Sequence, residues 1–266
     1  MSPAMRGKFL QSALAALAAT AVLVAGSATS AQKAPAPKAA AQKKEPSPYL
    51  ADRLRTDGFL QGGAQYRAQH AQAQWENLAQ EDGAVCREAL KAAGIKFTSL
   101  ADRKAPDTKG CGIPHGVMVS QGPTGIRYSP PLVVDCSLAA TLPKVEAILQ
   151  EEAERHLGGP ISRVGNLGTY SCRSVRGWAQ RISQHALGNA MDFSSFQPKR
   201  GRAVTVMRDY VRGGEAPEKP EERFLRAIYQ RLWSESGLTR VLGPDWDAAH
   251  RDHLHLDRGR RGWRFP

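Results

Sequence analysis

The sequence has no apolar run long enough to cross a bilayer, which takes about 20 residues in a helix. The nearest candidate, residues 9–25, is shorter. It follows Arg6 and Lys8 and precedes the small residues GSATSA, an arrangement typical of a secretory signal peptide. Residues 1–31 are therefore predicted to be a signal peptide that is cleaved before Gln32, with an uncleaved membrane anchor as the alternative.

Cysteine is scarce, and the few cysteines form no C-x-x-C pair. The lack of such a pair argues against a zinc knuckle, because the ligands of those sites come in closely spaced pairs. An even number of cysteines in an exported protein instead predicts two disulfides. Four cysteines allow three pairings, and the sequence leaves these open for Cys86, Cys111, Cys136 and Cys172.

No segment resembles a nucleic-acid-binding module, although the chain carries a formal net charge of +12. The basic residues are scattered and do not gather on one predicted helix, so nucleic acid is not expected as a partner. Attraction to anionic cell-wall polymers or to a membrane surface explains the charge better in an exported protein. Positive charge that serves only solubility remains an alternative.

Residues 32–83 contain few side chains that could form a core. Residues 33–48, KAPAPKAAAQKKEPSP, are mostly alanine, proline and lysine, which is typical of an extended tether. The polar, glutamine-rich stretch that follows predicts at most one helix, at residues 67–80. The packed domain is accordingly expected at residues 84–266.

Helical and strand-like patterns alternate in this domain. Apolar residues at helical spacing predict helices at residues 85–93, 142–157 and 221–236. Short segments between glycines and prolines predict strands at residues 162–166, 169–172, 189–196, 239–242 and 254–257, and the GCGI stretch at 110–113 predicts turns beside further short strands. Strands that follow a long helix, with a second helix inserted, indicate an α+β domain with a mainly antiparallel sheet and flanking helices.

Four of the seven histidines lie in two short windows, SQHALGNAMD at 183–192 and HRDHLHLD at 250–257. In a strand, Asp192 points away from its neighbours Met191 and Phe193, so it lies at the edge of the core and needs a cationic partner or a metal. Gly188 allows a tight turn that brings His185 back toward Asp192.

The second window places His253, His255 and Asp257 on one face of a strand, with His250 in a turn at the rim. A catalytic zinc ion is typically held by three nitrogen or oxygen ligands and keeps a fourth position open. His185, Asp192 and one of the paired histidines would meet this requirement and leave the other histidine for proton transfer. The alternative is that the histidines of the two windows only satisfy buried polar partners. The three remaining histidines are expected to be structural or exposed: His70, His115 and His156.

The first window resembles the S-x-H-x-x-G-x-A-x-D motif of zinc peptidases that cut bacterial cell-wall peptides, a group that unites D-Ala-D-Ala peptidases, lysostaphin-type endopeptidases and murein endopeptidase. All its fixed positions are met at residues 183–192. The ending HRDHLH at 250–255 is similar to the H-x-x-H-x-H ending of murein endopeptidase. More closely, CREAL, GCGI, YSCR, SQHALGNAMDF and VLGPDWDAAHRDHLHLD, in this order, resemble the bacterial extensin-like C-terminal domain family.

The resemblance to the peptidases implies a zinc-peptidase-like core in which His185, Asp192 and His255 bind Zn²⁺. It implies that His253 is the general base or stabilises the tetrahedral intermediate, and that Ser183 orients the loop or a ligand. Two catalytic candidates remain. Arg173 matches the place of a substrate-side arginine and could hold a carboxylate or an oxyanion, or it is only a surface arginine beside a disulfide. His250 could donate a hydrogen bond or only stabilise its turn.

One departure concerns the general base. The D-Ala-D-Ala peptidases use a glutamate in an E-x-x-H arrangement, and no glutamate lies near His255. Asp252 is in a corresponding place, but strand alternation points it away from the metal. Proton transfer would therefore fall to His253, or catalysis would be weak or absent.

These observations favour an exported zinc-dependent hydrolase, a peptidase that acts on peptidoglycan peptides in the periplasm or outside the cell by metal-activated water. A non-catalytic module that binds the cell wall is the principal alternative. A metal store or sensor is a weaker one, because it would fill every coordination position with protein ligands.

Overall fold

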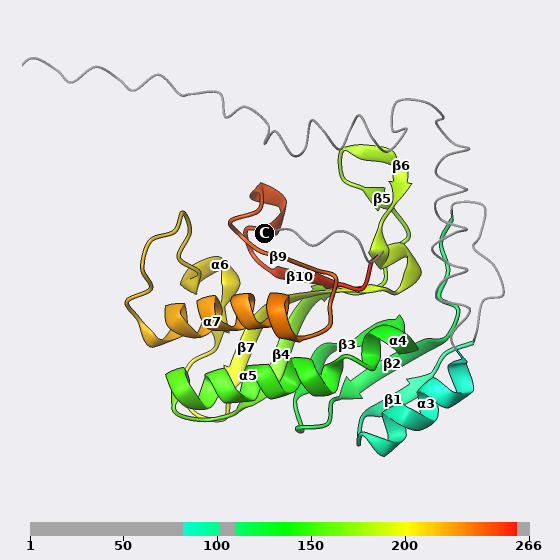
Figure 1. Cartoon of the computed structure of the whole chain (residues 1–266), viewed down its shortest axis with the longest axis horizontal. Coiled ribbons are helices and arrows are strands. Elements are labelled where there is room, and N and C mark those ends of the chain that lie inside the picture. The colour runs from blue at the N-terminus through cyan, green and yellow to red at the C-terminus, as the bar shows by residue number, and fades with distance from the viewer. Residues whose placement is uncertain (1–81, 102–109, 260–266) are drawn as a thin grey trace, which may run out of the picture. The chain divides into compact units, whose positions relative to one another are not determined.

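The structure is a computed structural model of the chain that describes residues 82–101 and 110–259 (Figure 1). Within these ranges the fold is α+β with a mainly antiparallel sheet, as the sequence predicts. The helices and 3-10 turns (η) are α3 (Gly83–Ala92), α4 (Cys136–Ala139), α5 (Leu142–Leu157), η1 (Gln184–Leu187), α6 (Val206–Asp209), α7 (Pro220–Glu235) and η2 (Ala248–His250). The strands are β1 (Lys96–Ser99), β2 (Gly116–Gln121), β3 (Arg127–Asp135), β4 (Ile161–Gly168), β5 (Ser174–Val175), β6 (Trp178–Ile182), β7 (Ala190–Pro198), β8 (Val204–Thr205), β9 (Arg240–Leu242) and β10 (Leu254–Asp257).

The main sheet has the strand order β1-β2-β3-β4-β7-β10-β9, and β8 pairs with β7. Neighbouring strands are antiparallel except β3 and β4, which are parallel. The pairing of β7 with β10 sets Asp192 opposite His255. A hairpin of β5 and β6 forms a separate small sheet. The sheet register therefore brings together two candidate metal ligands that lie 63 positions apart in the sequence.

Helices α5 and α7 pack against each other over one face of the sheet (Figure 1). Phe193 of β7 is fully buried, and Phe196 of the same strand meets Phe224 of α7 edge to face, with ring centroids 5.4 Å apart. Side chains alternate between the two faces along a strand. Asp192 and His255 therefore point to the face opposite the helices.

The two long helices agree closely with their predicted ranges. Helix α5 ends at Gly158, which takes the left-handed conformation with a φ of 69° that favours glycine. Helix α7 begins with Pro220 in its first turn, and the carboxylate of Glu222 accepts a hydrogen bond from the N–H of Lys219. The stripe that α5 buries includes Leu142, Val145, Ile148, Leu149 and Ala153.

Both predicted disulfides are present, and the structure gives their pairing. Cys86 is bonded to Cys136 and ties α3 to α4, while Cys111 is bonded to Cys172 in the loop before β5. All four cysteines are thereby used, which excludes a cysteine-ligated zinc knuckle. Among the described residues, no helix has both the length and the hydropathy that a membrane span requires.

One predicted strand, at residues 169–172, is wrong. These residues form a loop whose groups bond other segments: the hydroxyl of Thr169 accepts from the N–H of Val133, and the N–H of Ser171 donates to the carbonyl of His185. The strands β2, β3, β5 and β6 were not delimited by the sequence patterns. The predicted signal peptide, the tether and the helix at 67–80 lie outside the described residues.

Candidate metal centre

Three segments distant in sequence carry the candidate ligands: His185 lies on η1, Asp192 on β7 and His255 on β10. Ser183 caps η1 through its hydroxyl oxygen, which accepts from the N–H of His185 at 3.3 Å. Gly188 ends the turn with a φ of 64°, and a Cβ there would collide with neighbouring atoms. The predicted tight turn is therefore confirmed, and only glycine fits it without strain.

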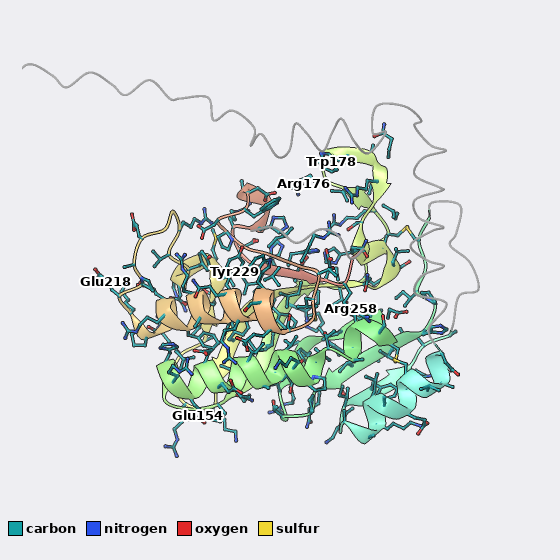
Figure 2. The ribbon with its side chains drawn as sticks, in the orientation of Figure 1. Glu154, Arg176, Trp178, Glu218, Tyr229 and Arg258 are labelled. Carbon is teal, nitrogen blue, oxygen red and sulfur yellow. A yellow bond between two sulfur atoms is a disulfide. The ribbon has the colours of Figure 1, made fainter. Side chains whose placement is uncertain are left out.

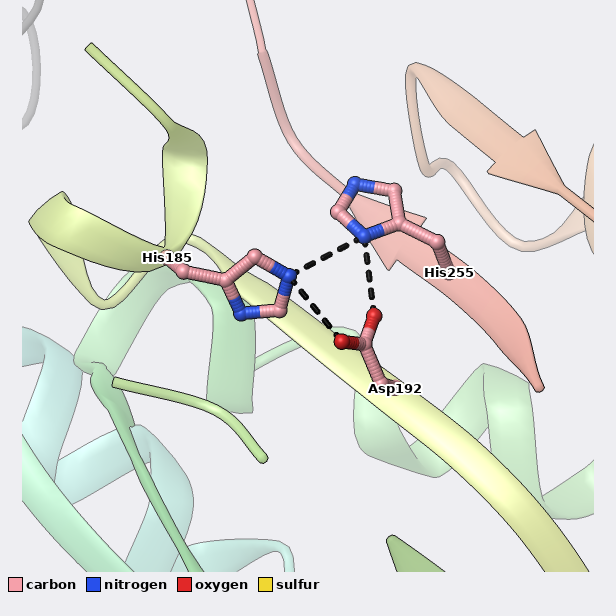
Figure 3. A group of neighbouring side chains, drawn as sticks. All are labelled: His185, Asp192 and His255. Carbon is pink, nitrogen blue, oxygen red and sulfur yellow. Dashed lines mark hydrogen bonds and ion pairs between the residues drawn. The ribbon is translucent and has the colours of Figure 1, made fainter. Parts of the chain in front are cut away.

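The three side chains converge on one point (Figure 3). Nε2 of His185 lies 3.1 Å from Nδ1 of His255 and 3.2 Å from Oδ2 of Asp192. Nδ1 of His255 lies 2.9 Å from Oδ1 of Asp192. The side chain of His185 is 3% exposed, and those of Asp192 and His255 are 12% exposed. The cluster is thus almost entirely buried. In such a buried position, lone pairs without a hydrogen-bond donor or a cation are costly.

Hydrogen bonds on the far side of each imidazole fix which nitrogen faces the cluster. Nδ1 of His185 lies 2.7 Å from the carbonyl oxygen of Thr169, which can only accept, so this nitrogen carries the proton. Nε2 of His255 donates in the same way to Oδ2 of Asp257 at 2.9 Å. Each neutral imidazole therefore directs an unprotonated nitrogen toward Asp192. Such an arrangement needs a cation at its centre, either a proton or a metal.

The charges of the metal-free cluster are strongly coupled. Burial by itself lowers the pKa of His255, but hydrogen bonds to Asp192 and Asp257 outweigh it and raise the pKa to about 9. Burial by itself raises the pKa of Asp192, but hydrogen bonds from His185 and His255 hold it well below its usual range. Without a metal, a proton on His255 therefore balances the charge of the cluster.

The geometry fits a tetrahedral metal ion. Ligands held about 2.0–2.1 Å from zinc at the tetrahedral angle lie roughly 3.3 Å from one another. The two imidazole nitrogens lie 3.1 Å apart, close to this value, and they lie 3.2 Å and 2.9 Å from the two different oxygens of Asp192. Two imidazole nitrogens and a carboxylate oxygen suit zinc, and three protein ligands leave a fourth position for water or substrate. His185, Asp192 and His255 could therefore hold a zinc ion.

His253 and His250 lie beside the cluster, with their ring centroids 5.3 Å apart. Nε2 of His253 is 3.6 Å from Oδ1 of Asp192, while its Nδ1 donates to Asp252 at 2.9 Å. Nδ1 of His250 donates to Asp247 at 2.7 Å. Burial lowers the pKa of His250, against the opposing effect of Asp247. Both rings thus leave Nε2 as an acceptor, and Asp252 orients His253.

Arg173 lies in an exposed loop between Cys172 and β5. In the part of the chain that the structure describes, no hydrogen bond or ion pair joins its side chain to the cluster. The β5–β6 hairpin that follows carries Arg176 and Trp178 (Figure 2). The guanidinium of Arg181 lies over the ring of Trp178 at 5.7 Å. The hairpin leads within a few residues to His185.

The other histidines do not join the cluster. His156 pairs with Glu152 on α5 at 3.3 Å, and His115 is partly buried at the start of β2. His70 lies outside the described residues. The predicted division between the two histidine windows and the rest is therefore preserved in the described part of the fold.

Sequence reasoning missed two groups that orient the cluster. It placed Asp257 on the face of His255 but gave it no role, although the H-x-D spacing on a strand was the available signal. The carbonyl of Thr169 could not be found in this way, because every residue has a carbonyl and only the fold aims this one at His185.

The family described as "Extensin-like protein C-terminus" matches residues 84–265. No curated protein and no solved structure matches the chain. The match spans every described helix and strand that carries a ligand, and its description names no activity.

Proposed function

The chain belongs to the extensin-like protein C-terminus family, and from the geometry of its buried cluster we propose that it is an exported zinc-dependent hydrolase that cleaves peptide bonds. One observation supports this above the others. In each of the two imidazoles, one nitrogen donates to an acceptor outside the cluster, which fixes the tautomer. The other nitrogen of each ring is an acceptor and points to the same carboxylate, about 3 Å away. A purely structural cluster would not need to bring two acceptor nitrogens this close to each other beside a carboxylate.

Each ligand would be held by its own element. His185 is fixed by the carbonyl of Thr169, His255 by Asp257, and Asp192 by its place on β7 opposite His255. A zinc ion held by these three residues would supply the Lewis acidity for polarising a peptide carbonyl and activating a water molecule. The burial of the cluster excludes other water and strengthens these electrostatic effects.

His253 is the proposed proton carrier. Its Nδ1 donates to Asp252, which leaves Nε2 free to take a proton from the attacking water and return it to the leaving amine. Its Nε2 lies 3.6 Å from Asp192, close enough for a group bound in the open position to reach it. His250, whose Nδ1 donates to Asp247, would need a second proton on Nε2 to stabilise the charge that develops on the carbonyl oxygen.

Peptidoglycan peptides are the proposed substrate. The resemblance to cell-wall peptidases supports this, and so does the charge of the region beside the cluster. No aspartate or glutamate occurs between Glu154 and Asp192, whereas this stretch includes Arg173 and Arg176. Exposed guanidinium groups suit the carboxylates of a peptide. The two disulfides fit an oxidising compartment such as the periplasm, where this polymer lies.

The experiment that tests the proposal is a digestion of murein sacculi. Protein from Gln32 onward, loaded with zinc, should release peptides that mass spectrometry identifies, and a chelator should stop the release. His253→Ala should strongly reduce release with zinc still bound. If sacculi bind to the zinc-loaded protein but no bond is cut with any divalent metal, the protein is a non-catalytic module that binds the cell wall and the proposed hydrolase activity is refuted.

A further inference from the structure

Asp257 lies directly behind one of the proposed ligands, at 1% exposure. Its Oδ2 accepts from Nε2 of His255 at 2.9 Å and lies 2.9 Å from Nε of Arg240. Its Oδ1 accepts from the N–H of Gly259 at 2.8 Å and from the hydroxyl of Thr239 at 3.3 Å. Both carboxylate oxygens are therefore fully engaged, which offsets the cost of burying the charge.

Two rigid strands determine this arrangement. Asp257 follows His255 by two positions on β10, so both side chains share one face, and the pairing of β10 with β9 sets Asp257 opposite Arg240. Space is also limited: a Cβ on residue 259 would lie 2.6 Å from Nη2 of Arg240 and 3.0 Å from Oδ1 of Asp257. The backbone at Gly259 therefore packs closely against the side chains of both Arg240 and Asp257.

We propose that Asp257, held by Arg240, is a positioning residue that keeps the proton of His255 on Nε2 and so presents Nδ1 to a divalent metal. The inference rests on the proposed metal site and adds to it the residue that orients the ligand His255. A carboxylate can only accept here, so the ring nitrogen that faces it must donate. Carboxylates that orient metal-bound histidines in this way also strengthen the ligand.

Asp257→Asn keeps the shape of the side chain but replaces one of its two acceptor oxygens with a donor NH₂. The N–H of Gly259 requires an oxygen at the Oδ1 position, which Nε of Arg240 also reaches at 3.1 Å, so the amide directs its NH₂ toward His255. Nε2 must then accept, and the proton moves to Nδ1, the atom that lies 2.9 Å from Asp192. The lone pair that a metal needs is lost.

The test measures zinc affinity by competition with a chelator of known affinity, on the whole protein from Gln32 onward. Asp257→Asn should weaken zinc binding by about 10- to 100-fold. The matched control is Asp209→Asn, which removes another buried carboxylate held by arginines, Arg202 and Arg208, and which should leave zinc affinity unchanged. Long-range ¹⁵N NMR of the histidine rings in the zinc-loaded wild type should place the remaining proton of His255 on Nε2.

Equal zinc affinity of wild type and Asp257→Asn would overturn the positioning role and leave the metal site intact. Equal losses in Asp257→Asn and Asp209→Asn would also overturn it, because both would then reflect general destabilisation. A wild type that binds no zinc would refute the proposed function itself, and the positioning role with it. A selective loss in Asp257→Asn, with the proton of wild-type His255 on Nε2, supports the proposal.

Discussion

Nε2 of His185 and Nδ1 of His255 lie 3.1 Å apart although 70 positions separate the two residues in the sequence. Both atoms are acceptors in the neutral rings, since the opposite nitrogens donate to Thr169 and Asp257. Two acceptors at this distance repel each other unless a cation lies between them or one of them is protonated. The close approach of the two nitrogens therefore calls for a cation, which is a proton on His255 or a metal ion held with Asp192.

Removing a ligand should remove the metal. His185→Ala is expected to reduce zinc from about one ion per chain to nearly none, because two ligands do not hold zinc against water. Elemental analysis of the purified protein measures this. His156→Ala is the control, since His156 pairs with Glu152 on α5 and should leave zinc content unchanged. Full zinc content in His185→Ala would exclude the proposed ligand set.

Replacing the proposed proton carrier, His253, should slow the reaction without changing metal binding. His253→Ala is expected to lower kcat for a peptidoglycan peptide by about 10²- to 10⁴-fold, with zinc content unchanged. Asp252→Asn should have a smaller effect in the same direction, because it weakens only the hydrogen bond that orients His253. An unchanged kcat in His253→Ala would show that a group other than His253 carries the proton.

Arg173, whose carbonyl accepts from the N–H of Ser183, should act on substrate binding alone. Arg173→Gln is expected to raise KM for a peptide with a free carboxylate by roughly 5-fold, the effect of losing about 1 kcal/mol of partly screened attraction, and to leave kcat near its original value. Steady-state kinetics at low and high salt would measure this. Lys144→Gln, which removes an exposed charge from α5, should change neither constant.

The turn that delivers His185 should not tolerate a side chain. Gly188→Ala adds a Cβ at a φ of 64°, 2.9 Å from Ile113 and 3.0 Å from the backbone nitrogen of Asp135. The free energy of unfolding in urea should fall by about 2–4 kcal/mol from strain and overpacking, and zinc affinity should fall with it. Gly159→Ala, where the added atom meets nothing within 4 Å, should change stability by less than about 0.5 kcal/mol.

Acid should destabilise the protein in part through Asp209. Burial by itself raises the pKa of Asp209, but hydrogen bonds from Arg208 and Arg202 outweigh it and lower the pKa from 3.8 to about 2. A carboxyl group whose pKa is lower in the folded state stabilises the fold above its unfolded pKa. That contribution is lost as the pH falls from about 4 to 2.

Asp209→Asn should therefore be less stable than wild type at pH 6, and the gap should narrow by about 1–2 kcal/mol at pH 2.5. Urea unfolding at the two pH values measures the difference. Glu218→Gln, which alters an exposed carboxylate, serves as the control and should follow the wild-type pH dependence. A gap that stays constant with pH would show that the charge of Asp209 is not the cause.

Much of the fold was accessible from local patterns. Helix α5 matches its predicted range because its apolar residues recur at helical spacing and a glycine ends it. The alternation along β7 and β10 correctly placed Asp192 and His255 on the face away from the core. The loop at 169–172 was misassigned, because its composition resembles a strand while its hydrogen bonds go to His185 and Val133.

The sequence by itself determined which residue types could form a metal site and which face of each strand would carry them, since the alternation of side chains is a local property of the backbone. Only the tertiary structure decided the pairing of the cysteines, the approach of Thr169 to His185 and the closure of Arg240 and Asp257 behind His255. Those contacts join segments that are far apart along the chain, and their distances depend on how the sheet and its loops close in space.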